Sequence, residues 1–173
     1  MIQNLINDIN RAKSNEAYIS ALALALTLPD ICGKIEYQNS KVGFRYVKWY
    51  DNWVYKYFEQ KESENEFIAR AENVVAFDGV FCYQLRCAIL HSGNTEIIVN
   101  GVKWDTLELS VCKSGKQKGY ALVCDVSNSD VKNINVNLNV VHLIDAIILG
   151  VKGYLTDKGD IFDVYGNISI ELL

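Results

Sequence analysis

Apolar residues recur three and four positions apart along the first part of the chain, which is the spacing of one helix face. They predict an amphipathic helix over residues 2–12, with Ile2, Leu5, Ile6 and Ile9 on its apolar side. A second helix is expected from a cap at Ser14 or Asn15 to about Leu28, where Pro29 and Asp30 stop it. This helix is apolar nearly all round, which indicates a central position in a bundle. The residues from there to 43 are expected to form a connection, with glycines as breakers.

The most aromatic segment is 44–60, FRYVKWYDNWVYKYFEQ. Its aromatic side chains make one helical stripe, formed by Tyr46, Trp49, Tyr50, Trp53 and Tyr57. Basic residues lie between them, so the helix has the composition of a surface that stacks nucleic-acid bases. A buried aromatic stripe with solvated charges at its edge is the more common arrangement. We expect the buried stripe here, because the chain as a whole is acidic.

A further helix is predicted from about Ala76 to His91, after a polar, acidic joint at 62–66. Its apolar face consists of Phe77, Val80, Phe81, Leu85, Ile89 and Leu90. Gly93 follows almost directly, and a glycine just beyond the last turn is a usual helix stop.

The pattern then changes from helical to alternating. Residues 96–99 and 102–111 flank the dipeptide Asn100-Gly101, which suits a two-residue hairpin turn with positive φ at both positions. The alternation shifts phase between Trp104 and Leu107, which indicates a bulge. After a basic turn at 113–119, a third strand is expected over 120–126. About thirty residues, 95–126, would thus form a small antiparallel sheet.

The helical period returns from Asn137 or Asn139 and runs to about Tyr154, followed by a turn at 156–160. Residues 134–138 alternate apolar side chains with asparagines, a pattern that fits either a strand or the start of the helix. Residues 168–172 are expected to be a last strand or a loose tail. The predicted fold class is therefore mainly α (α+β), one domain over 1–173: a helical bundle from 1–93 and 138–154 with the antiparallel sheet inserted between them.

Composition excludes some classes of protein. Seventeen Lys and Arg against 21 Asp and Glu give a formal net charge of −4, so the surface as a whole does not attract nucleic acid. The five cysteines, at 32, 82, 87, 112 and 124, include no C-x-x-C pair, which favours reduced, buried thiols over a disulfide framework and leaves little for a structural metal site. The apolar run 17–28 lacks a clean basic flank and is too short to span a bilayer. We expect a cytoplasmic protein with no membrane segment.

The best candidates for reactive residues are Arg86 and His91, five residues apart at the end of the predicted helix from Ala76 to His91. On an ideal α-helix these side chains point about 140° apart and lie about 7.5 Å apart along the axis. They can still converge, because the backbone turns where the helix ends, or because two copies of the helix meet at a two-fold axis. A helix C-terminus favours protonated imidazole, and an arginine offers a planar fork for phosphate oxygens. The pair suits cleavage of an RNA phosphodiester without a metal or other cofactor.

A second cationic cluster, Lys113, Lys116 and Lys118, lies in the basic turn. Its sequence KSGK lacks the full phosphate-loop pattern and stands between strands, not before a helix. The three lysines remain candidate substrate contacts, although a solvated hairpin tip is the more common role.

Helices followed by the segment 85–93, LRCAILHSG, resemble the HEPN superfamily, whose signature is an arginine, four to six residues, then a histidine, commonly R-N-x-x-x-H. Arg86 and His91 match the two fixed positions. The wider phrase looks like a group of small, uncharacterised bacterial HEPN-like proteins. The resemblance covers roughly 1–93 and 138–154 and leaves the sheet as an insertion.

The resemblance implies a homodimeric helical bundle in which the motifs of both copies line one cleft. Many such proteins are metal-independent endoribonucleases in toxin–antitoxin, phage-defence or CRISPR systems, and others are binding modules that have lost the activity. It further implies that Arg86 contacts the scissile phosphate and that His91 is the acid/base. Cys87 departs from the family, since a polar asparagine often stands there and cysteine forms weaker hydrogen bonds.

Two hypotheses follow. A dimeric ribonuclease, acting on RNA and held in check by a protein antitoxin, predicts a positive cleft with Arg86 and His91 exposed in it. A non-catalytic HEPN-like interaction module predicts that Arg86 forms an internal salt bridge and that His91 is packed.

Overall fold

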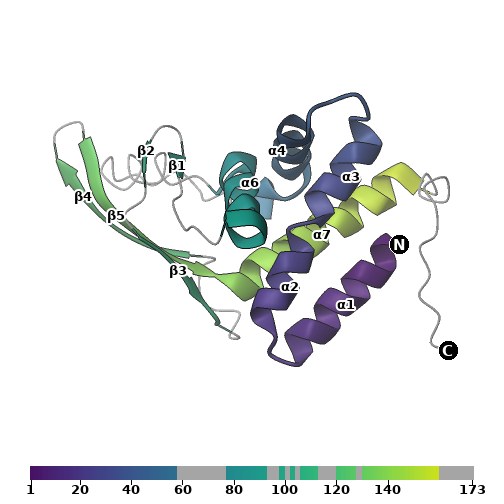
Figure 1. Cartoon of the computed structure of the whole chain (residues 1–173), viewed down its shortest axis with the longest axis horizontal. Coiled ribbons are helices and arrows are strands. Elements are labelled where there is room, and N and C mark those ends of the chain that lie inside the picture. Colours follow the sequence, from purple (N-terminus) through teal and green to yellow (C-terminus); the bar gives the residue numbers. More distant parts are fainter. Residues whose placement is uncertain are drawn as a thin grey trace.

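The computed structural model describes residues 1–57, 77–92, 98–99, 102–103, 106–112, 120–127 and 130–159. Its helices are α1 (Ile2–Ser14), α2 (Tyr18–Ala25), α3 (Leu28–Glu36), α4 (Val42–Trp53), α6 (Gly79–Cys87) and α7 (Val140–Lys158), with a short 3₁₀ turn η1 (Tyr55–Tyr57) and a π-turn η2 (Ala88–Ser92). Its strands are β1 (Ile98–Val99), β2 (Val102–Lys103), β3 (Thr106–Ser110), β4 (Tyr120–Ser127) and β5 (Asp130–Asn139). Figure 1 shows the helices gathered into a bundle and the long strands extending away from it. The expectation of a mainly helical protein with a small sheet is confirmed.

The sheet is mixed, so the prediction of an antiparallel sheet is wrong in one respect. Strand order is β3-β5-β4, with β4 antiparallel to β5 but β3 parallel to β5. The reason is that residues 130–139 form a strand and take the central place. Both outer strands then pair with β5 and not with each other. The predicted hairpin is confirmed only at its tip, where β1 pairs antiparallel with β2 through Val99 and Val102.

The alternation left open in the sequence belongs to β5. Ile134, Val136 and Leu138 are 1 %, 1 % and 0 % exposed, and they face the core. The intervening asparagines lie on the other face, where Asn135 accepts a hydrogen bond from Thr106 at 2.7 Å and Asn137 donates one to Glu108 at 3.3 Å. One face of β5 is therefore apolar and joins the core, and its other face is polar.

Pro29 begins a helix instead of ending one. It lies in the first turn of α3, where a missing N–H leaves no helical bond unmade. Most of the predicted connection after it is helical as a result. Gly33 is not a breaker but a contact point, since a Cβ there would lie 2.7 Å from the carbonyl oxygen of Arg45 on α4. The stretch Tyr18–Glu36 is long and apolar enough to cross a membrane by length and composition alone, and 44 % of its most apolar window is buried within the protein.

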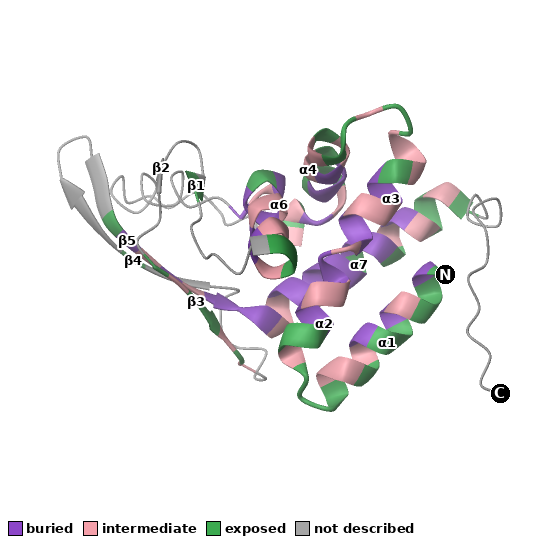
Figure 2. Cartoon of the chain, in the orientation of Figure 1, coloured by how far each residue is buried: buried purple, intermediate pink, exposed green. Residues whose placement is uncertain are grey.

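The aromatic stripe is core, as expected from the acidic composition. Tyr46, Trp49 and Tyr50 on α4 are all 0 % exposed. Trp49 packs edge-on against Tyr154 of α7 with ring centroids 5.6 Å apart. Figure 2 shows α7 buried along much of its length behind the other helices. The predicted helix of 139–154 is thus confirmed, and it continues to Lys158 through most of the expected turn.

Asn139 joins the sheet to the bundle. Its side-chain oxygen accepts hydrogen bonds from the N–H groups of Val141 and His142 and so caps α7. The same amide exchanges two hydrogen bonds with the backbone of Cys112, just beyond β3, at 3.4 and 3.3 Å. A single buried side chain therefore fixes where β5 ends, where α7 begins and where β3 lies.

Two carboxylates bind the N-terminus of α6, and one of them belongs to α4. Asp78 caps it by accepting from the N–H of Phe81 at 2.9 Å, and Asp51 of α4 accepts from the N–H of Gly79 at 2.7 Å. A Cβ at Gly79 would lie 2.5 Å from the carbonyl oxygen of Val47, so only glycine permits this approach. The predicted acidic joint, the bulge at Trp104, the basic turn and the tail at 168–172 lie outside the described residues.

Candidate functional site

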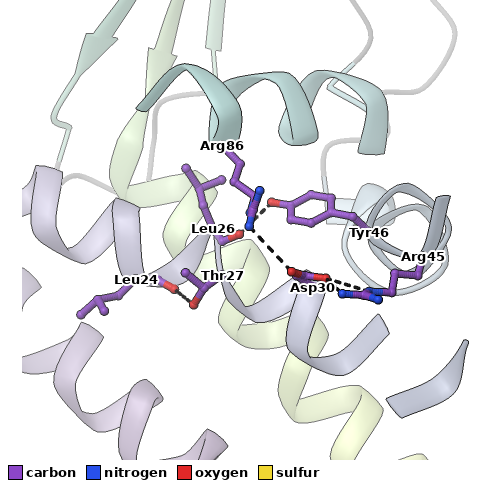
Figure 3. Close-up of polar contacts among 7 residues, drawn as sticks. All are labelled: Leu24, Leu26, Thr27, Asp30, Arg45, Tyr46 and Arg86. Carbon is purple, nitrogen blue, oxygen red and sulfur yellow. Dashed lines mark hydrogen bonds and ion pairs between the residues drawn. The ribbon is translucent and has the colours of Figure 1, made fainter. Parts of the chain in front are cut away.

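Arg86 lies in the last turn of α6 and points across the bundle towards α3 (Figure 3). Its Nη2 is 3.7 Å from Oδ2 of Asp30. The other oxygen of the same carboxylate accepts a hydrogen bond from Nε of Arg45 on α4 at 2.8 Å, and Nη2 of Arg45 forms an ion pair with it, also at 2.8 Å. Asp30 therefore lies between two guanidinium groups, and the three side chains are 22 %, 16 % and 13 % exposed for Asp30, Arg86 and Arg45.

The Tyr46 ring packs against this cluster. The guanidinium carbon of Arg86 lies 5.9 Å from the centre of the Tyr46 ring, a cation–π contact. The Tyr46 hydroxyl donates to the carbonyl oxygen of Leu26 at 3.0 Å and lies 3.4 Å from Sγ of Cys82. Burial raises the pKa of Tyr46 well above its usual value and raises the pKa of Cys82 to about 12, so both stay neutral at physiological pH. The charges of the cluster are those of two arginines and one aspartate.

In this arrangement the positive charge of Arg86 is in excess. Arg45 makes a short, charge-assisted hydrogen bond and a close ion pair to Asp30, whereas the Arg86 contact is longer than a hydrogen bond. In addition, Nε of Arg86 is buried and has no acceptor among the described residues. A buried donor left unsatisfied costs about 1–3 kcal/mol. An anionic oxygen brought to this guanidinium would satisfy the donor and balance the charge.

His91 follows Arg86 through a change of helix type. The sequence predicts an α-helix as far as His91, but α6 ends at Cys87 and residues Ala88–Ser92 form a π-turn. A π-turn has i→i+5 hydrogen bonds, so it brings residues five apart closer to the same side than an α-helix does. Single π-turns of this kind occur frequently at functional sites. His91 is exposed in this turn, and Arg86 lies two residues before the turn begins, in the last turn of α6.

Each of the two side chains thus agrees with a different hypothesis. Arg86 forms an internal salt bridge, as the interaction module predicts, and His91 is exposed, as the ribonuclease predicts. Sequence reasoning missed Asp30, which was interpreted as a helix stop, and Arg45, which was interpreted as the charged edge of the aromatic stripe. No local pattern links these residues, since they lie on three different helices.

The other candidates lie elsewhere. Lys113, Lys116 and Lys118 fall outside the described residues. Within the described part of the chain, no group of three His, Cys, Asp or Glu side chains is placed to hold a metal ion. A shallow hollow lined by Lys13, Ser14, Glu16, Tyr18 and Val141 lies at the α1–α2 corner and includes none of the residues of the cluster.

No protein-family model, curated protein or solved structure matches this chain. The resemblance to the HEPN superfamily therefore stays a prediction that depends on Arg86, His91 and their helical setting.

Proposed function

We propose that this chain is a HEPN-like, metal-independent endoribonuclease that works as a cytoplasmic homodimer in a defence or toxin–antitoxin system. Arg86 and His91 are its reactive pair. The observation that carries the proposal is the second guanidinium on a single carboxylate, five residues before an exposed histidine in the sequence. The cluster has a surplus positive charge where a phosphate would need it, in a chain whose net charge is −4.

Arg86 can turn towards a phosphate without exposing a bare carboxylate. Arg45 keeps its hydrogen bond and its ion pair to Asp30 when Arg86 leaves, so the part-buried acid stays paired. The unsatisfied Nε of Arg86 gains an acceptor in the same movement. This makes a phosphate oxygen a better partner for Arg86 than the aspartate it touches at 3.7 Å.

The proposed reaction is an attack by the ribose 2′-oxygen on the adjacent phosphorus. His91 of one copy accepts the 2′-hydroxyl proton, and an imidazolium, supplied by the second copy at the dimer axis, protonates the leaving 5′-oxygen. Arg86 stabilises the charge on the phosphorane. The products are a 2′,3′-cyclic phosphate and a 5′-hydroxyl, and the two proton transfers balance.

A non-catalytic HEPN-like binding module is the second candidate, and two observations favour it. Arg86 is only 16 % exposed, and Cys87 occupies the position at which the superfamily often has asparagine. In this role the pair would hold RNA or a protein partner without cutting it.

Incubation of synthetic single-stranded RNA with the protein in EDTA tests the proposal. We expect cleavage to products with cyclic phosphate ends, and a loss of about 100-fold or more in His91→Ala, the usual contribution of a general acid or base. His142→Ala, which removes the other of the two histidines, is the matched control and should keep its activity. A 2′-deoxy sugar at the cleaved position should block the reaction. Equal cleavage by wild type and His91→Ala would remove His91 from the mechanism, and binding without cleavage would favour the second candidate.

A further inference from the structure

Three exposed lysines lie at the corner between α3 and α4: Lys34, Lys41 and Lys48. Residues 30–51 also include Arg45 and three acids, Asp30, Glu36 and Asp51. Asp30 is paired with Arg45, and Oε1 of Glu36 lies 3.7 Å from Nζ of Lys158. Asp51 accepts a hydrogen bond from the N–H of Gly79. The three lysines therefore form a small positive surface on a protein that is negative overall.

An exposed aromatic pair lies within this positive surface. Phe44 is 56 % exposed, which is unusual for so large an apolar side chain. Its ring meets that of Tyr37 edge-on, with centroids 6.4 Å apart and an interplanar angle of 81°. Nζ of Lys48 lies 5.6 Å from the Phe44 centroid and 5.8 Å from the Tyr37 centroid. The ammonium group is thus held against both rings.

The helix α4 separates this surface from the core. Lys41, Phe44 and Lys48 are spaced three and four residues apart, so they share one face of the helix. The neighbouring side chains Tyr46 and Trp49 are fully buried on another face. The aromatic segment therefore has two aromatic faces, one in the core and one in solvent. We call the solvent face, Tyr37, Lys41, Phe44 and Lys48, the Phe44 surface.

We infer that the Phe44 surface is a subsite for single-stranded RNA, in which an unpaired base stacks on Phe44 and the ammonium groups of Lys41 and Lys48 contact the flanking phosphates. An exposed ring with cations around it is the usual composition of such sites, because every base has a flat face and every nucleotide a negative charge. Duplex RNA does not fit, since its bases are already stacked. The inference deepens the proposed function and rests on RNA being the substrate.

The same helix links this subsite to the reactive pair. Arg45 follows Phe44 directly, and its guanidinium is bound to Asp30, whose second oxygen faces Arg86. Phe44 is thus one residue from Arg45, and Arg45 shares Asp30 with Arg86.

Binding of a fluorescein-labelled 12-nucleotide oligouridylate with 2′-O-methyl sugars tests the inference separately from catalysis, because this probe lacks the attacking hydroxyl. We expect Phe44→Ala to weaken binding roughly 5- to 100-fold, the usual effect of losing one base–aromatic stack. Phe44→Trp should restore it. Lys41→Gln and Lys48→Gln should each lower the salt dependence of binding by about 0.7 in the slope of log K against log salt. Ile19→Ala, which truncates another exposed apolar side chain (60 % exposed) on α2, is the matched control and should bind like wild type.

The outcomes separate the two proposals. Phe44-dependent binding by a protein that cuts no RNA supports the subsite and overturns the ribonuclease. Cleavage that persists unchanged in Phe44→Ala, with unchanged affinity for the probe, overturns the subsite and leaves the ribonuclease. Binding of poly-glutamate in competition with the probe, with no effect of Phe44→Ala, identifies an acidic protein partner and overturns base stacking. Thermal melts of each variant show whether it is folded.

Discussion

Asp30 holds two arginines, and replacing it with asparagine tests which of them depends on it. Asparagine keeps the size of the side chain and removes the charge. Arg45 then loses a charge-assisted hydrogen bond and an ion pair, both of 2.8 Å, and Arg86 loses an ion pair at 3.7 Å. All three side chains are at most 22 % exposed, so water replaces little of what is lost.

We expect Asp30→Asn to lower the free energy of unfolding by about 3 kcal/mol, the lower end of the range for a buried pair broken by removing one partner. Arg86→Met should lower it by at most about 1 kcal/mol, because Asp30 stays bound to Arg45 and the longer contact resembles a surface pair. For a chain of this length these values correspond to about 6–12 °C and at most about 4 °C in Tm. Arg45→Met should fall between them.

Urea denaturation followed by tryptophan fluorescence measures the differences, since Trp49 is fully buried. Asp8→Asn is the control: its ion pair with Arg11 is exposed, at 55 % and 76 %, and its loss should not be measurable. If Arg86→Met were as destabilised as Asp30→Asn, Arg86 would not be the surplus cation. The proposal of a phosphate contact at Arg86 would then lose its main support.

Three further predictions concern the fold around the site. Gly150→Ala should cost about 1–3 kcal/mol in urea denaturation, because a Cβ there would lie 2.7 Å from Cγ2 of Val54. Gly153→Ala is the control in the same helix: a Cβ there would lie 3.9 Å from the Trp53 ring, so this variant should gain about 0.5–1 kcal/mol of stability. A gain at both positions would contradict the packing of α7. Asn139→Ala should cost about 1–2 kcal/mol and shorten α7, seen as lost helical circular dichroism. Burial raises the pKa of Asp51, opposed by the hydrogen bond from the Gly79 N–H and aided by the charge of Asp78. The folded protein therefore binds a proton on Asp51 more tightly than the unfolded chain does. This proton binding stabilises the fold at low pH, and the stabilisation is lost as pH rises through the folded pKa. Asp51→Asn should therefore gain stability relative to wild type between about pH 4 and pH 7, and a constant difference across this range would refute the assignment.

The helices were predictable where the apolar period is long and uninterrupted. The helices α1, α4 and α7 follow their apolar spacing closely, and the buried stripe of α4 follows from composition. Pro29 misled the prediction because a proline ends one helix and opens another with the same residue. The prediction of the sheet was wrong for a different reason. Its strands were largely located, but strand pairing joins residues that are far apart in the sequence. No local pattern therefore shows that β5 lies between β3 and β4.

The candidate site was likewise predictable only in part. The spacing of Arg86 and His91 is visible in the sequence, and so are the exposed positions of Lys41, Phe44 and Lys48 once α4 is known to be a helix. The π-turn that alters the direction of His91 is not, since it depends on how α6 ends against its neighbours.

The sequence by itself determined the class of structure, the aromatic core and the two residues on which a function can be proposed. Periodicity and composition are local properties, and a single chain displays them without folding. Only the tertiary structure decided that Arg86 and Arg45 share Asp30, and that Lys48 lies against the rings of Tyr37 and Phe44. These depend on which helix faces are brought within a few ångströms of each other, and electrostatic interactions follow distance in space, not separation along the chain.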